Sequence, residues 1–194
     1  MNLPNKLSLI RIIMAPVILF FLVVPLGIPE PWLSILTAAL FAATSITDLL
    51  DGKIARKHGL ITDFGKFIDP LADKFLVISA LLGIIVKYEW SRLAVVWATA
   101  IVILREFAVT SMRMIVSNKD GTVIAAGWLG KVKTTLQLVF IHTIILEPVI
   151  FGWFPPCRDW HILSCITMAG MVVMTLWSGI DYLRQYWKYL SPNK

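Results

Sequence analysis

The chain has 194 residues, of which 58% are hydrophobic and only 15% are charged, and its mean hydropathy is +0.78. This composition is far more apolar than that of an ordinary globular domain, so it indicates an integral membrane protein. The net charge of +6 could suggest a nucleic-acid-binding protein. We exclude nucleic acid as a partner because the basic residues border apolar segments and no soluble domain remains to enter a groove.

Six apolar windows follow one another along the chain, and each is close to the roughly 20 residues that a bilayer crossing requires. They are Ser8 to Val24, Trp32 to Leu50, Phe67 to Val86, Leu93 to Val116, Thr134 to Phe154 and Ile162 to Tyr182. The connections are short and contain no repeat or linker, so we predict a single domain over residues 1–194. The predicted fold is an all-α integral membrane protein with six transmembrane helices.

The residues that border these windows give three further expectations. Apolar Leu3, Leu7 and Ile10 recur at helical spacing among polar residues, which predicts a short N-terminal interfacial helix before the first span. Pro70 suits the first turn of the third span. Two cysteines flank the last outer connection, and we expect both to be unpaired buried thiols: Cys157 and Cys165.

Basic residues are concentrated in alternate connections. They lie near the N-terminus, between the second and third windows, after the fourth window and at the C-terminus, and include Lys6, Arg11, Lys53, Arg56, Lys57, Lys66, Lys119, Lys131, Lys133, Arg184, Lys188 and Lys194. The other connections hold only Lys87, Arg92 and Arg158. The positive-inside rule therefore predicts a multi-pass protein of the cell membrane with both termini in the cytoplasm.

Four aspartates lie at the ends of the second and third windows, where a carboxylate is costly. They fall in the frame Asp48-x2-Asp51-Gly52-x2-Ala55-Arg56-x8-Gly65-x3-Asp69-x3-Asp73. Each pair shares a helix face, and a hairpin would bring both pairs to the same depth. Carboxylates so close together need cations, and hard divalent ions such as Mg²⁺, Mn²⁺ or Ca²⁺ prefer oxygen ligands. We therefore predict that all four aspartates bind metal.

The same segment contains residues that suit a phosphate ligand. Gly52 and Gly65 lack side chains, which would let a bulky ligand approach the backbone. Arg56 provides a planar donor group suited to a phosphate. Thr62 and Asn5 are polar and lie near the expected rim of the site. The segment therefore predicts a nucleotide or pyrophosphate bound through metal ions at the membrane surface.

At every fixed position this frame resembles the signature of the CDP-alcohol phosphotransferase family. The resemblance implies a transmembrane domain of six helices, with two divalent cations, Mg²⁺ or Mn²⁺, held by Asp48, Asp51, Asp69 and Asp73. It implies a CDP-linked lipid bound near Gly52 and Arg56. It also implies that Asp73 is the general base and that the protein is a homodimer.

A second charged region occupies the ends of the fourth and fifth windows. Arg105 and Glu106 are intramembrane charges, so each needs a partner or a polar cavity. Arg113 follows Arg105 by eight residues and lies near the same helix face. We predict that Arg105, Arg113, Lys131 and Lys133 form a basic pocket for an acceptor that carries a phosphate. The alternative is that these residues only end helices and contact anionic lipid.

The runs Asn2 to Arg11, Arg105 to Thr110 and Gly130 to Thr134 resemble the branch of the family that uses sn-glycerol 3-phosphate. This resemblance implies transfer of the phosphatidyl group from CDP-diacylglycerol to that acceptor, giving phosphatidylglycerophosphate and CMP, at an active site facing the cytoplasm. Because no Ser, Cys or His stands in a nucleophile relay with the carboxylates, we expect direct metal-assisted in-line attack.

Three other interpretations remain open. The protein could use another acceptor within the same family, namely phosphatidylglycerol, inositol phosphate or serine. A cation transporter would also bind ions through intramembrane acids, but it predicts carboxylates spread along a crossing route and discontinuous helices. A lipid-binding protein without turnover would bind the CDP-lipid and release no CMP.

Overall fold

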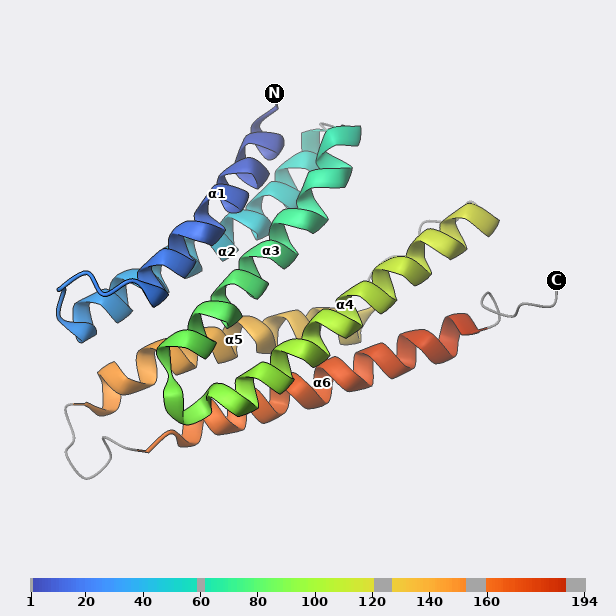
Figure 1. The fold of residues 1–194 in the computed structure, drawn as a ribbon. Coiled ribbons are helices and arrows are strands. Elements are labelled where there is room, and N and C mark those ends of the chain that lie inside the picture. Colours follow the sequence, from blue (N-terminus) through green and yellow to red (C-terminus); the bar gives the residue numbers. More distant parts are fainter. Residues whose placement is uncertain (1, 59–61, 121–126, 153–159, 188–194) are drawn as a thin grey trace.

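The computed structural model describes residues 2–58, 62–120, 127–152 and 160–187, and every regular element within these ranges is a helix (Figure 1). The long helices are α1 (Leu3–Val23), α2 (Glu30–His58), α3 (Asp63–Lys87), α4 (Arg92–Asp120), α5 (Trp128–Phe151) and α6 (Ile162–Tyr186). A short 3₁₀ helix, η1 (Glu89–Ser91), joins α3 to α4. The predicted all-α fold is confirmed over these ranges.

Four helical segments in the described part of the chain are long and apolar enough to cross a membrane. They are Asn5–Val23, Glu89–Val116, Trp128–Phe151 and Ile162–Tyr186, within α1, η1 with α4, α5 and α6. This confirms the membrane character of the chain. Six spans stay a prediction, because α2 and α3 are not among the four.

The structure does not show a separate N-terminal interfacial helix. α1 is continuous from Leu3 to Val23, and a proline stands in its first turn. Proline is tolerated there because the first backbone N–H groups of a helix have no intrahelical partner. The residues predicted for an interfacial helix are instead the first turns of α1.

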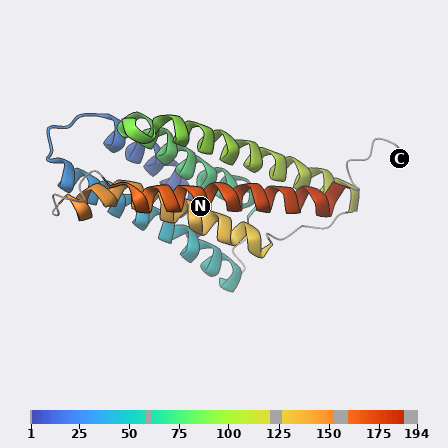
Figure 2. The ribbon, with the colours of Figure 1, turned by 90° about the horizontal axis from the view of Figure 1, so that it is seen from below.

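Successive helices run in opposite directions, so that α1, α3 and α5 begin near the end of the molecule where α2, α4 and α6 finish (Figure 1). We call this the site end. α1 packs against α3 and α2, whereas α6 packs against both α4 and α5. Figure 2 shows α6 lying between α4 and α5. α3 contacts α1, α4 and α5, and therefore links the two groups of helices.

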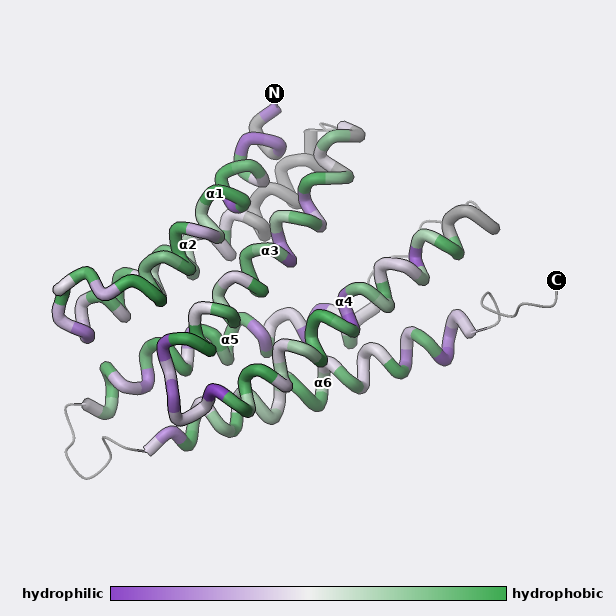
Figure 3. The backbone as a smooth tube through the Cα atoms, in the orientation of Figure 1, coloured by the Kyte–Doolittle hydropathy of each residue, from purple (hydrophilic) through white to green (hydrophobic). Residues whose placement is uncertain are grey.

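One apolar core receives side chains from all six helices. Its fully or almost fully buried members include Ile18, Phe41, Leu81, Val102, Phe140 and Met171. In Figure 3 the hydrophobic residues run along the helices, while hydrophilic residues gather at the start of α1 and in the α3–α4 connection. Burial of these side chains fixes the order of the helices.

The helices extend beyond the apolar windows at the site end. α2 continues past Leu50 to His58, α3 begins at Asp63, and α5 begins at Trp128. The expectation that Pro70 occupies the first turn of its helix is therefore wrong, because Pro70 lies inside α3. A proline there removes one backbone hydrogen bond of the helix.

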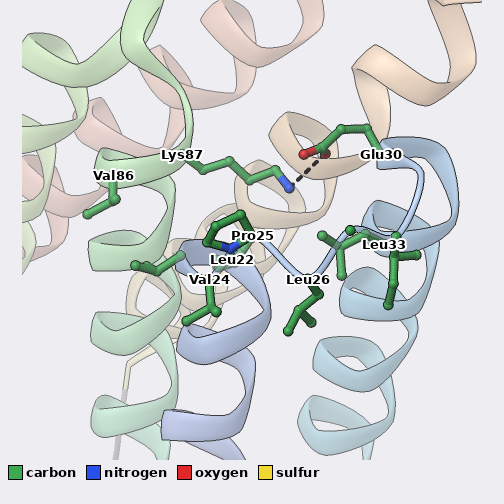
Figure 4. A pocket seen from close by; sticks show the side chains of 11 residues that line it. Leu22, Val24, Pro25, Leu26, Glu30, Leu33, Val86 and Lys87 are labelled. Atoms are coloured by element: carbon green, nitrogen blue, oxygen red, sulfur yellow. Dashed lines mark ion pairs between the residues drawn. The ribbon is translucent and has the colours of Figure 1, made fainter.

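The opposite end of the molecule contains a small cavity of about 260 Å³ beside the α1–α2 connection (Figure 4). Gly27 in this connection has a φ of +70°, a left-handed conformation that glycine adopts without steric cost. Lys87 of α3 forms an ion pair with Glu30 of α2 at 2.9 Å. Because the Glu30 side chain is 72% exposed, water screens this pair, and we expect it to contribute little to stability.

Glu147 of α5 caps the N-terminus of α6. Its carboxylate accepts hydrogen bonds from the backbone N–H of Leu163 at 2.8 Å and of Ser164 at 2.9 Å, and also from the Ser164 hydroxyl. The first N–H groups of a helix otherwise lack partners, and a negative charge is favourable there. This buried contact fixes the angle at which α6 leaves α5.

The cysteine expectation is wrong in one respect. Cys165, in the first turn of α6, is exposed and not buried. Cys157 lies outside the described residues, so the expectation that the two cysteines are unpaired stays a prediction.

We predict that Glu147→Gln lowers the stability of the protein by about 1–3 kcal/mol, because an amide has one acceptor oxygen and no charge to offer the helix end. Thermal unfolding in detergent would measure the change. Glu89→Gln is the matched control, since the Glu89 side chain is 83% exposed in its pair with Arg92. Equal melting temperatures for the two variants would contradict the role of Glu147.

Candidate active site

The first contact at the site end joins the beginnings of α1 and α3. Thr62 is the N-cap of α3, and its hydroxyl accepts a hydrogen bond from the backbone N–H of Gly65 at 3.0 Å. The Asn5 side chain of α1 donates from Nδ2 to the same hydroxyl oxygen at 2.9 Å. Asn5 and Thr62, which the sequence analysis predicts at the nucleotide rim, therefore lie in contact and hold α1 against α3.

Gly65 permits this contact. A Cβ atom built at Gly65 would lie 2.8 Å from Oδ1 of Asn5 and 3.1 Å from Oγ1 of Thr62. The first distance is shorter than the contacts that real Cβ atoms make. The structure thus gives Gly65 a packing role between two helices, in addition to the ligand clearance that the sequence suggests.

Asp69 lies one turn beyond Gly65 and is held from the side of α1. The hydroxyl of Ser8 donates to Oδ1 of Asp69, and Nη2 of Arg11 lies 3.8 Å from the same oxygen. Ser8 and Arg11 are 0% and 1% exposed, whereas the Asp69 side chain is 47% exposed. One side of the carboxylate is therefore fixed by buried groups while the rest remains accessible.

Ser8 and Arg11 belong to the Asn2 to Arg11 run noted in the sequence, but neither was predicted to contact Asp69. The two residues lie three apart, on one face of α1. An arginine within an apolar helix needs a partner, and this was the signal that could have identified Arg11.

Asp73 lies one turn further along α3 and lines a cavity of about 310 Å³ between α3, α4 and α5. The ionisable residues that line the cavity are Asp73, Lys74, Arg105, Glu106, Arg113 and Lys133. Three of the four predicted acceptor residues are thus brought together with Asp73. Lys131 is not, because it is exposed on α5 and does not line the cavity.

Glu106 is the centre of the charge network in this cavity. It forms an ion pair with Arg105 at 3.1 Å, contacts Nζ of Lys133, and lies 3.9 Å from Nζ of Lys74. Lys74 also donates a hydrogen bond to the hydroxyl of Thr110. Thr110 ends the Arg105 to Thr110 run noted in the sequence, but neither Thr110 nor Lys74 was predicted to take part in the site.

The two arginines of the cavity are supported by α6. A Cβ atom at Gly179 would lie 3.0 Å from Cγ of Arg105, so the glycine leaves the space that the arginine stem fills. The guanidinium of Arg113 lies 5.6 Å from the centre of the Tyr182 ring, within cation–π range. Among the described residues, neither buried Nε atom has a hydrogen-bond partner in the protein.

Asp48, Asp51, Gly52 and Arg56 lie along the last turns of α2. Their side chains are outside the part of the chain that the structure describes. Among the residues that it does describe, no group of three potential metal ligands occurs. The donor chemistry of the frame nevertheless fits hard divalent cations, because all four predicted ligands are carboxylates and Asp69 is half-exposed.

A family model described as CDP-alcohol phosphatidyltransferase matches residues 1–177. The chain belongs to this family. The family that the aspartate frame predicts is therefore confirmed.

Several curated relatives resemble the chain over nearly its whole length. A CDP-diacylglycerol–glycerol-3-phosphate 3-phosphatidyltransferase of Bacillus subtilis is 37% identical, with 99% of this chain and 98% of the relative covered. A probable phosphatidylglycerophosphate synthase of Mycobacterium tuberculosis is 36% identical, with 94% and 80% covered. A CDP-diacylglycerol–glycerol-3-phosphate 3-phosphatidyltransferase of Escherichia coli is 33% identical, with 94% and 93% covered.

We predict that Gly65→Ala destabilises the protein by about 1–3 kcal/mol, because the new methyl group would collide with Oδ1 of Asn5. Thermal unfolding would measure the loss. Adding Asn5→Ala to Gly65→Ala should make the combined loss smaller than the sum of the two single losses, because it removes the atom that the methyl group meets.

Gly170→Ala in α6 is the matched control, since a Cβ there would lie 3.9 Å from its nearest neighbour in Leu136. Equal stability of the Gly65→Ala and Gly170→Ala variants would contradict the proposed packing role of Gly65.

Proposed function

We propose that this chain transfers the phosphatidyl group of CDP-diacylglycerol to sn-glycerol 3-phosphate, forming phosphatidylglycerophosphate and CMP. The observation that carries the proposal is the shared cavity in which Asp73 of the aspartate frame lies together with Arg105, Arg113 and Lys133. The names of the relatives, which specify this donor and this acceptor, support it.

The charge of the cavity favours an acceptor that already carries a phosphate. Among the described residues, four basic and two acidic side chains line the cavity, which is an excess of two positive charges. A phosphate monoester carries a charge of about −1.5 to −2 at neutral pH and presents several acceptor oxygens. Free serine, one of the alternative acceptors, has no phosphate to match this excess.

The proposal gives Asp48, Asp51, Asp69 and Asp73 the role of holding two divalent cations, Mg²⁺ or Mn²⁺. When bound, such cations neutralise charge on a pyrophosphate and on the departing nucleotide. Ser8 and Arg11 would fix the orientation of Asp69 for this role. We also propose that the CDP-lipid binds near Gly52, Arg56, Thr62 and Asn5, with the last two forming a wall where α1 meets α3.

In the proposed reaction, the oxygen of the acceptor hydroxyl attacks the lipid-side phosphorus in line, and Asp73 accepts the proton of that hydroxyl. The new phosphorus–oxygen bond forms while the bond to CMP breaks. Arg105, Arg113 and Lys133 would hold the acceptor phosphate so that the hydroxyl faces the phosphorus. No Ser, Cys or His is among the described lining residues of the cavity, which supports direct transfer over a covalent intermediate.

We also propose six membrane spans, from the apolar windows and the resemblance to the family, and a single domain over residues 1–194, from the short connections. A homodimer is proposed from the resemblance to the family. Both termini and the site end would lie in the cytoplasm, where the basic connections favour them. The water-soluble acceptor and CMP would then enter and leave on the same side of the membrane.

The proposal predicts that purified protein with CDP-diacylglycerol and Mg²⁺ releases CMP at least tenfold faster with sn-glycerol 3-phosphate than with serine, inositol phosphate or phosphatidylglycerol. Chelation should stop the reaction, and Mg²⁺ or Mn²⁺ should restore it. Faster release with another acceptor would assign that acceptor instead. Binding of the lipid without CMP release would favour a non-catalytic protein, and cation flux without CMP release would favour a transporter.

The two aspartates of α3 should respond differently to substitution. Asp73→Asn should lower kcat by about 10²–10⁴-fold while retaining much of the metal binding, because an amide cannot accept the proton. Asp69→Asn should lose both activity and metal binding. CMP release and calorimetric titration with Mn²⁺ would measure the two properties. Full activity of Asp73→Asn would exclude Asp73 as the base.

A further inference from the structure

Glu106 is an acidic residue within a cavity that is otherwise suited to an anion. Its side chain is 14% exposed, and its partners come from three helices: Lys74 of α3, Arg105 of α4 and Lys133 of α5. A carboxylate in a phosphate-binding cavity would be expected to repel the ligand. Its presence there therefore requires a reason.

The basic residues around Glu106 differ in how they are held. The Lys133 side chain is 5% exposed, and Nζ contacts Oε1 of Glu106. Lysine has a long flexible stem, and its ammonium group could take many positions if no partner fixed it. Arg113, by contrast, lies against the Tyr182 ring. Glu106 contacts Lys133, Lys74 and Arg105, and the two lysines have the more flexible side chains of the three.

We propose that Glu106 is a positioning residue, which holds Lys133 and Lys74 at the cavity wall and thereby sets the affinity for the phosphorylated acceptor. This inference rests on the proposed function of the cavity. One carboxylate bridges three helices, so the cavity wall is already arranged before the acceptor arrives, and binding has to order fewer side chains.

A simpler role for Glu106 predicts the opposite result. If the carboxylate only reduced the positive charge of the cavity, its neutralisation would strengthen the attraction for a phosphate and lower the KM of the acceptor. If it positions the lysines, its neutralisation releases them and raises the KM. The sign of the change in KM therefore separates the two roles.

Glu106→Gln is the decisive variant, because it keeps the size of the side chain and removes its charge. We expect the KM for sn-glycerol 3-phosphate to rise on the order of tenfold, with kcat changed less than threefold and the KM for CDP-diacylglycerol unchanged. An unchanged or lower KM for sn-glycerol 3-phosphate would overturn the proposal. A fall in kcat alone would also overturn it.

A variant that keeps the negative charge at position 106 provides a second measurement of the KM. Glu106→Asp retains the carboxylate but shortens its reach, so its KM should lie between those of the wild type and Glu106→Gln. Glu89→Gln, which neutralises an exposed carboxylate in η1 just before α4, should leave all three parameters unchanged. A KM for Glu106→Asp equal to or above that of Glu106→Gln would count against positioning by the charge.

A double-mutant cycle tests whether Glu106 acts through Lys133. Lys133→Met should raise the KM of the acceptor by itself, and adding Glu106→Gln should raise it much less than in the wild-type background. If the KM of the double variant rises by the product of the two single-variant increases, Glu106 acts independently of Lys133. Melting temperatures of all variants would identify any that fold poorly. If the double variant folds poorly, the KM values of the single variants are compared instead.

The outcome for the wild type keeps the two proposals separate. If the wild type releases no CMP with sn-glycerol 3-phosphate, the proposed function fails. If it does so and Glu106→Gln has an unchanged KM, the proposed function stands and the role of Glu106 fails.

Discussion

Charged side chains in apolar helices need partners, and in this protein the partners come from neighbouring helices. Arg11 of α1 lies beside Asp69 of α3, and Lys74 of α3 lies beside Glu106 of α4. Glu106 in turn contacts Lys133 of α5. These contacts run across four helices at the site end. Each offsets part of the cost of a charge in an apolar helix, and together they determine where the polar groups of the candidate site are placed.

Glycine makes two of the close approaches possible. Without a side chain at Gly65, the beginnings of α1 and α3 meet through Asn5 and Thr62, which brings Ser8 and Arg11 of α1 beside Asp69. Gly179 of α6 leaves room for the stem of Arg105 on α4. The spacing of the aspartate frame therefore includes a packing requirement as well as a chemical one. A methyl group at either glycine would separate helices that carry the charged residues.

The acidic residues at the two ends of the molecule have different surroundings. At the site end the ionisable residues line a cavity, and the buried Nε atoms of Arg105 and Arg113 have no hydrogen-bond partner among the described residues. Near the opposite end the Glu147 carboxylate is fully engaged by the first turn of α6. Glu147 is buried and the Glu106 side chain is 14% exposed, and among the described residues only Glu106 of the two lies among several cations. This difference in surroundings explains why we assign Glu106 to ligand binding and Glu147 to stability.

The sequence by itself determined the membrane character, the all-α fold and the family, because the composition, the apolar windows and the aspartate frame can all be identified without knowing which helices pack together. It misplaced Pro70 and missed the helix extensions at the site end, since hydropathy marks apolar stretches and not helix ends. Only the tertiary structure showed that Ser8 and Arg11 hold Asp69, that Glu106 joins Lys133, and that Lys131 lies outside the cavity. Spacing along one helix fixes which residues share a face, but the rotation and packing of neighbouring helices decide which faces meet.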